Sequence, residues 1–155
     1  MGALKDCERI TESLLGQPVN SLTALAFVIV GSLLFVMTRR RWVAVGSIGT
    51  GVGSFLFHGP MPTGAQLTHD LTLWFLVVVA VIAMVTDLRN GTDWRGLVGP
   101  LALLAVVAVI GRLGATGGPL CDPDSVLQPH GIWHLGAATA ILWWATAYRV
   151  PGTKH

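Results

Sequence analysis

Five long windows of the sequence contain no charged residue, and this distribution constrains the fold more than any other feature. They cover residues 14–38, 42–69, 71–86, 96–111 and 125–148. A charge at the centre of a bilayer costs roughly 2.5 to 3.5 kcal/mol, and a transmembrane helix needs about 20 largely apolar residues. We therefore predict an all-α integral membrane protein with five transmembrane helices near residues 20–38, 42–58, 69–87, 94–112 and 128–148. They form one membrane-embedded domain over residues 1–155.

Composition narrows the expected partners. Apolar residues make up 52% of the chain and charged residues 12%, whereas charged residues are about a quarter of an ordinary soluble domain. The formal net charge is only +2. No stripe of Lys and Arg interleaves with aromatic residues, as nucleic acid recognition requires. We expect a membrane lipid as partner and no nucleic acid.

The basic residues predict an orientation. The positive-inside rule assigns the side richer in Lys and Arg to the cytoplasm, which puts the N-terminus outside and the C-terminus inside. Arginine outnumbers lysine, and Ala, Gly and Val are abundant, which indicates a bacterial cell membrane. The inner set is Arg39, Arg40, Arg41, Arg89, Arg95, Arg149 and Lys154, and the outer set is Lys5, Arg9 and Arg112.

Few polar residues enter the predicted spans, and five of them lie at the outer end. Ser54 and His58 close the second span, Asp70 opens the third, and His130 and His134 open the fifth. Residues four apart share one helix face. Each of the two pairs therefore presents its side chains in one direction, and the two faces can converge.

Three neutral imidazoles with one open position form a typical catalytic zinc site. His58, His130 and His134 supply that set, with Asp70 as a general base or as an acceptor that orients a ligand. Ser54 can hydrogen-bond a developing oxyanion. His69 points about 100° away from Asp70, so we expect it beside the ligands or at the interface, although it can also replace one of them. Interfacial histidines that bind no metal are the simpler alternative.

The same residues resemble a known motif string. Ser54-Phe55-Leu56-Phe57-His58, then Asp70, then His130-Gly131-Ile132-Trp133-His134 is similar to the signature of the CREST superfamily of membrane metal-dependent hydrolases. Cys7-Glu8 followed by Gln17-Pro18-Val19-Asn20-Ser21 is most similar to its alkaline ceramidase branch.

The resemblance implies a fold, a cofactor and a reaction. In that family three histidines bind zinc, a serine and an aspartate assist, and ceramide is hydrolysed at its amide bond. Carried over, the ligands are His58, His130 and His134, with Ser54 and Asp70 as catalytic residues. The expected function is a zinc-dependent hydrolase that releases a fatty acid from an N-acyl lipid. The alternatives are a receptor or lipid-binding protein with structural zinc, and a haem-binding electron carrier.

The chain departs from that family in two respects. Family enzymes have seven spans, so the five predicted here leave a thinner wall around the substrate, which a second subunit can complete as a homodimer. The ceramidases also bind calcium near the N-terminus. Asp6, Glu8 and Glu12 offer carboxylates for it, but Gln17 occupies what would be an acidic position, and calcium prefers carboxylates.

The remaining candidates are two cysteines and two tryptophans. Cys7 and Cys121 are the only cysteines, and the predicted topology puts both on the oxidising outer side. We expect a disulfide between them, a link that the family also has, and two unrelated buried thiols are the alternative. Trp74 and Trp133 lie near the predicted site, where they either line an acyl pocket or belong to an outer aromatic belt.

Overall fold

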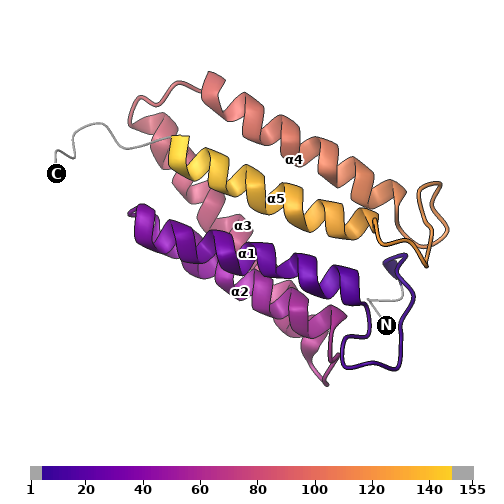
Figure 1. Ribbon diagram of the computed structural model, residues 1–155. Helices are drawn as coiled ribbons and strands as arrows, with labels where there is room; N and C mark the ends of the chain where they lie inside the picture. Colours follow the sequence, from indigo (N-terminus) through magenta and orange to yellow (C-terminus); the bar gives the residue numbers. More distant parts are fainter. Residues whose placement is uncertain (1–4, 148–155) are drawn as a thin grey trace.

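The computed structural model describes residues 5–147, which form five α-helices (Figure 1). The all-α fold is confirmed, and each helix begins and ends within two residues of its predicted bounds except at the start of α3. Tyr148, Arg149 and Lys154, which belong to the predicted fifth helix and inner basic set, lie outside the described residues. The helices are α1 Pro18–Met37, α2 Arg41–His58, α3 Ala65–Arg89, α4 Arg95–Leu113 and α5 Pro129–Ala147.

The turn between α2 and α3 explains the early start of α3. Gly64 has a φ of +87°, in the left-handed region that favours glycine. Its carbonyl already accepts a hydrogen bond from the Thr68 amide at 3.0 Å. Helix formation therefore begins directly after this glycine, and His69 and Asp70 lie one turn inside α3 instead of at its first residues.

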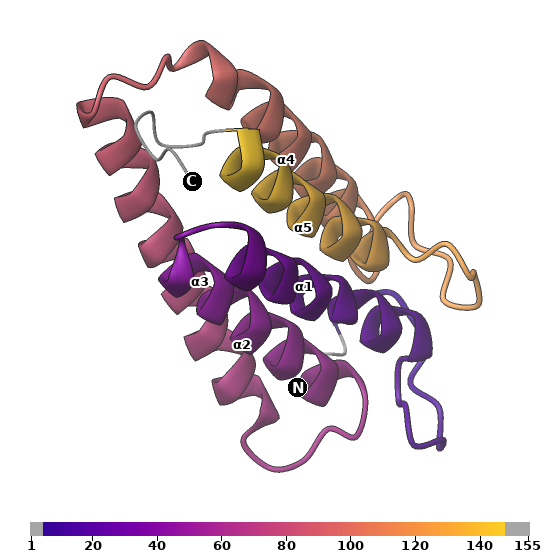
Figure 2. The same cartoon turned by 60° about the vertical axis from the view of Figure 1, so that its left-hand side comes forward.

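The helices lie side by side in the order α3, α2, α1, α5, α4 (Figures 1 and 2). Successive helices run in opposite directions, so the starts of α1, α3 and α5 lie at the same end as the last residue of α2, His58. We call this the histidine end. The opposite end carries Arg39, Arg40 and Arg41 at the turn from α1 to α2, and we call it the arginine end.

The two outermost helices expose most of their apolar surface. Only 11% of the apolar window of α3 and 17% of that of α4 are buried, against 39% for α1. These three helices are long and apolar enough to cross a membrane. Contiguous apolar surface of this extent is unfavourable in water and favourable in lipid, so the structure supports the assignment to the membrane.

The central helices pack closely because small residues allow their backbones to approach each other. A Cβ added at Gly31 of α1 would lie 2.7 Å from the Ala44 carbonyl oxygen and 2.8 Å from the Ile48 amide nitrogen of α2. The buried apolar core that results consists of Phe27, Val30, Leu34, Val43, Ala44, Leu76, Leu97, Ala137, Ala138, Trp144 and Ala145.

Replacing Gly31 with valine should destabilise the protein, because the new side chain meets the rigid backbone of α2. Overpacking of this kind costs about 1–3 kcal/mol, which should appear as a lower thermal transition in detergent micelles. Ser32→Val is the matched control, since Ser32 is the next residue on α1 and is exposed. Equal transitions for the two variants would contradict the close α1–α2 contact.

Candidate metal centre

Three histidine side chains converge at the histidine end. His58 is the last residue of α2, and His130 and His134 occupy the first two turns of α5. Their ring centroids lie 4.9 Å (His58–His130), 5.5 Å (His58–His134) and 4.5 Å (His130–His134) apart. One ring nitrogen from each lies within 4.8 Å of the other two. The structure thus brings together the three residues that the sequence predicts as metal ligands.

The centre is almost closed to its surroundings. His58 is 0% and His134 is 2% exposed, whereas 23% of the His130 side chain is accessible. Buried polar atoms nearly always have a hydrogen-bond partner. The Nε2 atoms of His58 and His130 are buried and have none among the described residues. Two unsatisfied imidazole nitrogens in one buried cluster are what a metal site without its ion would leave.

Each imidazole has an oxygen atom beside its other nitrogen. Nδ1 of His58 lies 2.7 Å from Oε1 of Gln17, and Nδ1 of His134 lies 3.2 Å from Oγ1 of Thr23. Nδ1 of His130 lies 3.3 Å from Oδ1 of Asp6. These contacts favour the tautomer with the proton on Nδ1 and leave the Nε2 lone pair for a metal ion.

The other hydrogen bonds of Gln17 and Thr23 show that the histidine is the donor in the contacts with His58 and His134. The side-chain amide nitrogen of Gln17 donates to the carbonyl oxygen of Glu8 at 2.8 Å and to that of Asp6 at 3.2 Å, so its Oε1 is left to accept from His58. The Thr23 hydroxyl donates to the Val19 carbonyl at 2.8 Å, so it accepts from His134. Neutral imidazoles held in this way suit zinc, for which histidine is a common ligand.

An N-terminal segment carries Asp6 to the histidines. The adjacent Cys7 forms a disulfide with Cys121, with their Cα atoms 5.3 Å apart, which confirms the predicted link. The amide of Thr116 donates to the Lys5 carbonyl at 2.9 Å, and the amide of Arg9 donates to a carbonyl of the same loop at 3.1 Å. We call residues 5–9 the strap, because both of its ends and its centre are attached to the loop before α5.

Glu8 and Glu12 do not join Asp6 in a common site. The Glu8 carboxylate accepts hydrogen bonds from the Val19 amide at 2.7 Å and the Asn20 amide at 2.8 Å, and so satisfies free donors in the first turn of α1. Glu12 is exposed. Burial raises the pKa of the Asp6 carboxyl to about 6. The three predicted calcium ligands therefore have separate surroundings.

Asp70 contacts His69 and not the three clustered histidines. Its Oδ1 lies 2.8 Å from Nδ1 of His69, and half of its side chain is exposed. The His69 ring stacks on Phe57, with centroids 4.9 Å apart, and its centroid is 6.4 Å from that of His58. Asp70 therefore pairs with His69, and His69 in turn neighbours His58. Ser54 is buried one turn before His58 on α2, at 1% exposure.

The two predicted pocket tryptophans have different surroundings. Trp74 is 66% exposed on α3, a placement that suits the aromatic belt. Trp133 is partly buried against the apolar core, where its Cβ would be 3.2 Å from a Cβ added at Gly111 of α4. Trp133 therefore packs α5 against α4.

The sequence does not predict that Gln17 and Thr23 contact the ligands. It also predicts Asp6 as a calcium ligand and not as a neighbour of the histidines. The resemblance marks Gln17 as part of the ceramidase-like string and as a departure from a calcium site, but not as a partner of a ligand, and no sequence pattern marks Thr23. Asp6 was grouped with calcium carboxylates, although its charge lies beside His130 and, at 4.0 Å, His58. A sequence signal existed for Gln17, because it directly precedes Pro18, a residue favoured at the start of a helix.

Comparisons of the chain with protein-family models, with curated proteins and with solved structures give no significant match.

Proposed function

We propose that this protein is a zinc-dependent hydrolase of the membrane that cleaves an amide bond of a lipid and releases a fatty acid, as alkaline ceramidases do. The observation that carries the proposal is the buried cluster of His58, His130 and His134. Their Nδ1 atoms lie beside oxygen atoms, and the Nε2 atoms of His58 and His130 have no hydrogen-bond partner among residues 5–147. The motif resemblance supplies the reaction class.

In this proposal all five helices span the membrane, with the N-terminus outside. α2 and α5 contain no acidic residue, and each packs between two other helices of the row. The histidine end then faces the outer leaflet. The amide bond of an N-acyl lipid lies near the headgroup, at the depth of the cluster.

A zinc ion held by the three histidines would lower the pKa of a water molecule and polarise the acyl carbonyl. The chain's own residues provide the proton transfer. Nδ1–H of His69 donates to the Asp70 carboxylate at 2.8 Å, so the lone pair on Nε2 of His69 can accept the proton of the attacking water and return it to the amine that leaves. We assign the hydroxyl of Ser54 to the oxyanion that develops on the carbonyl.

The second candidate is a lipid receptor in which zinc only holds α2 and α5 together. The burial of His58 and His134 favours it, because structural zinc sites are closed whereas catalytic sites keep an open position. The partial exposure of His130 favours the enzyme. A haem carrier fits poorly, since rings only 4.5 to 5.5 Å apart leave no room for a macrocycle between them.

A second copy of the chain can complete the substrate chamber. α3 and α4 form the two edges of the row, and none of the described helices lies on the outer side of either (Figure 2). We propose a homodimer in the membrane, in which the exposed apolar face of one edge helix covers the partner. A monomeric mass in both detergent and nanodiscs would count against it.

Replacing Asp70 with asparagine should separate the two candidates. Asp70 touches no clustered histidine, so zinc content should stay at the wild-type level, while hydrolysis of a labelled N-acyl lipid should fall about 100-fold or more, in the range of general base catalysis. Product release is measured by mass spectrometry, with an ester analogue in parallel. Asp93→Asn, at the arginine end, is the control. Wild-type turnover in Asp70→Asn would exclude the His69–Asp70 pair as the proton acceptor.

A further inference from the structure

The side chain of Asn20, in the first turn of α1, is buried without hydrogen bonds. Asn20 is 0% exposed, and both polar atoms of its carboxamide, Oδ1 and Nδ2, have no hydrogen-bond partner among residues 5–147. Burying an amide group in this state is unfavourable, and such groups are rare in folded proteins. A bound molecule that accepts a hydrogen bond from this carboxamide would remove the penalty.

The Asn20 side chain faces the space between α2 and α5. Thr23 lies about 60° to one side of Asn20 around the helix axis, and its hydroxyl is 3.2 Å from Nδ1 of His134 on α5. Val28 lies about 80° to the other side, and its Cγ2 would be 2.6 Å from a Cβ added at Gly51 of α2. Asn20 therefore points between the two helices that carry the clustered histidines.

Asn20 also lies at the depth of the three-histidine centre. Gln17 and Thr23 flank it at a spacing of three residues on either side. Oε1 of Gln17 is 2.7 Å from His58, and Oγ1 of Thr23 is 3.2 Å from His134. Residues three apart are neighbours on a helix surface. Asn20 is thus between two side chains that each hold a ligand imidazole.

A carboxamide in this position suits the stabilisation of negative charge. Its N–H groups donate hydrogen bonds, and asparagine is one of the side chains that stabilise the oxyanion of acyl transfer reactions. Ser54, which the proposed mechanism assigns to the same oxyanion, belongs to α2, whereas Asn20 belongs to α1. The two helices can therefore present one donor each.

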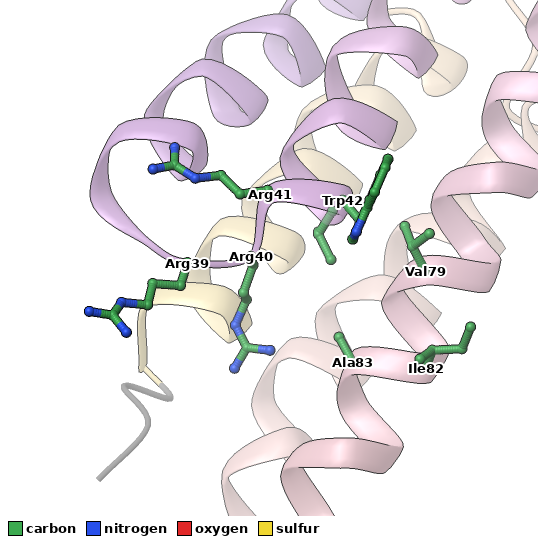
Figure 3. Close-up of a pocket in the computed structure, with 8 residues that line it drawn as sticks. Arg39, Arg40, Arg41, Trp42, Val79, Ile82 and Ala83 are labelled. Carbon is green, nitrogen blue, oxygen red and sulfur yellow. The ribbon is translucent and has the colours of Figure 1, made fainter. Parts of the chain in front are cut away.

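The groove at the arginine end is apolar and does not suit the polar part of a lipid. Trp42 of α2 and Ile82 of α3 line it, and Figure 3 shows the guanidinium groups of Arg39 and Arg41 turned away from α3. Trp42 lies sixteen residues before His58 on α2, which corresponds to about 24 Å. The polar partners of an amide bond are therefore found at the histidine end.

We propose that Asn20 is a second hydrogen-bond donor to the acyl carbonyl oxygen of the lipid. This inference rests on the proposed hydrolysis and names a further residue for it. Nδ2–H of Asn20 donates to the carbonyl oxygen from α1, while the Ser54 hydroxyl donates from α2. Asn20 transfers no proton and stays neutral throughout. Its hydrogen bond strengthens as negative charge develops on the oxygen, so it contributes more to the transition state than to substrate binding.

The Asn20→Ala variant tests this role in the full-length protein. Its kcat for a labelled N-acyl lipid should fall about 100- to 1000-fold, the effect of removing one oxyanion donor, while KM and zinc content stay near the wild-type values. Its affinity for a phosphonate analogue of the lipid, which imitates the charged tetrahedral state, should fall by a similar factor in calorimetry. Because the carboxamide bonds no described residue, the thermal transition should not fall.

Ser47→Ala is the matched control. Ser47 is also 0% exposed, and its hydroxyl also has no partner among the described residues, but it lies eleven residues before His58 on α2. Its kcat and phosphonate affinity should equal those of the wild type. Wild-type values of both in Asn20→Ala, or a thermal transition well below that of Ser47→Ala, would overturn the role of Asn20 and leave the proposed hydrolase intact. A wild-type protein that neither hydrolyses the lipid nor binds the phosphonate would overturn both.

Discussion

The His134→Ala variant should lose its zinc and its lipid hydrolysis together. His134 is one of three ligands, and two imidazoles cannot complete a three-histidine zinc site. Because the side chain is 2% exposed, its removal also leaves a cavity between α1 and α5. We expect less than a tenth of the wild-type zinc content by elemental analysis, and no measurable turnover of an N-acyl lipid.

His69→Ala is the matched control for this result. His69 bonds Asp70 and stacks on Phe57, so its removal should preserve the zinc content and lower only turnover. The comparison also decides whether His69 replaces one of the three ligands. Zinc retained in full by His134→Ala and lost from His69→Ala would contradict the assigned ligand set.

The Asp6→Asn variant should bind zinc about 10 to 100 times more weakly. Groups that orient a ligand imidazole have effects of this size on metal affinity. Asparagine keeps the shape of the side chain but removes the negative charge that lies 3.3 Å from Nδ1 of His130. Competition with a chromophoric chelator measures the affinity. The d–d spectrum of the cobalt-substituted protein reports whether the ligand geometry has changed.

Glu12→Gln is the control for Asp6→Asn. It makes the same chemical change in the same part of the chain, at an exposed residue outside the strap. Its zinc affinity should equal that of the wild type. If Asp6→Asn also binds zinc as tightly as the wild type, the carboxylate of the strap does not orient the ligand.

The helices and the histidine ligands could be predicted because both depend on local patterns. Charge-free windows locate helices in a lipid environment, and a spacing of four residues places His130 and His134 on one face whatever surrounds α5. His58 could be added because alternating helices bring the end of α2 to the start of α5. The disulfide was predicted on similar grounds, since the chain has only Cys7 and Cys121.

The residues around the ligands could not be predicted in the same way. Asp6 belongs to a segment without helical periodicity, and its position depends on the strap, the disulfide and the loop before α5. Asp70 was the obvious carboxylate because it lies in a predicted span. In the structure α3 packs against α2, and Asp70 pairs with His69, whose ring centroid lies 6.4 Å from that of His58. These positions follow from tertiary packing, which spacing alone does not determine.

X-ray absorption at the zinc edge of the purified wild-type protein tests the central claim most directly. We predict one zinc ion per chain, with three imidazole nitrogens at about 2.0 to 2.1 Å and one further light ligand that leaves room for water. A protein purified without zinc, or a spectrum that requires sulfur ligands or fewer than three imidazoles, would contradict the assignment of His58, His130 and His134 as a metal centre.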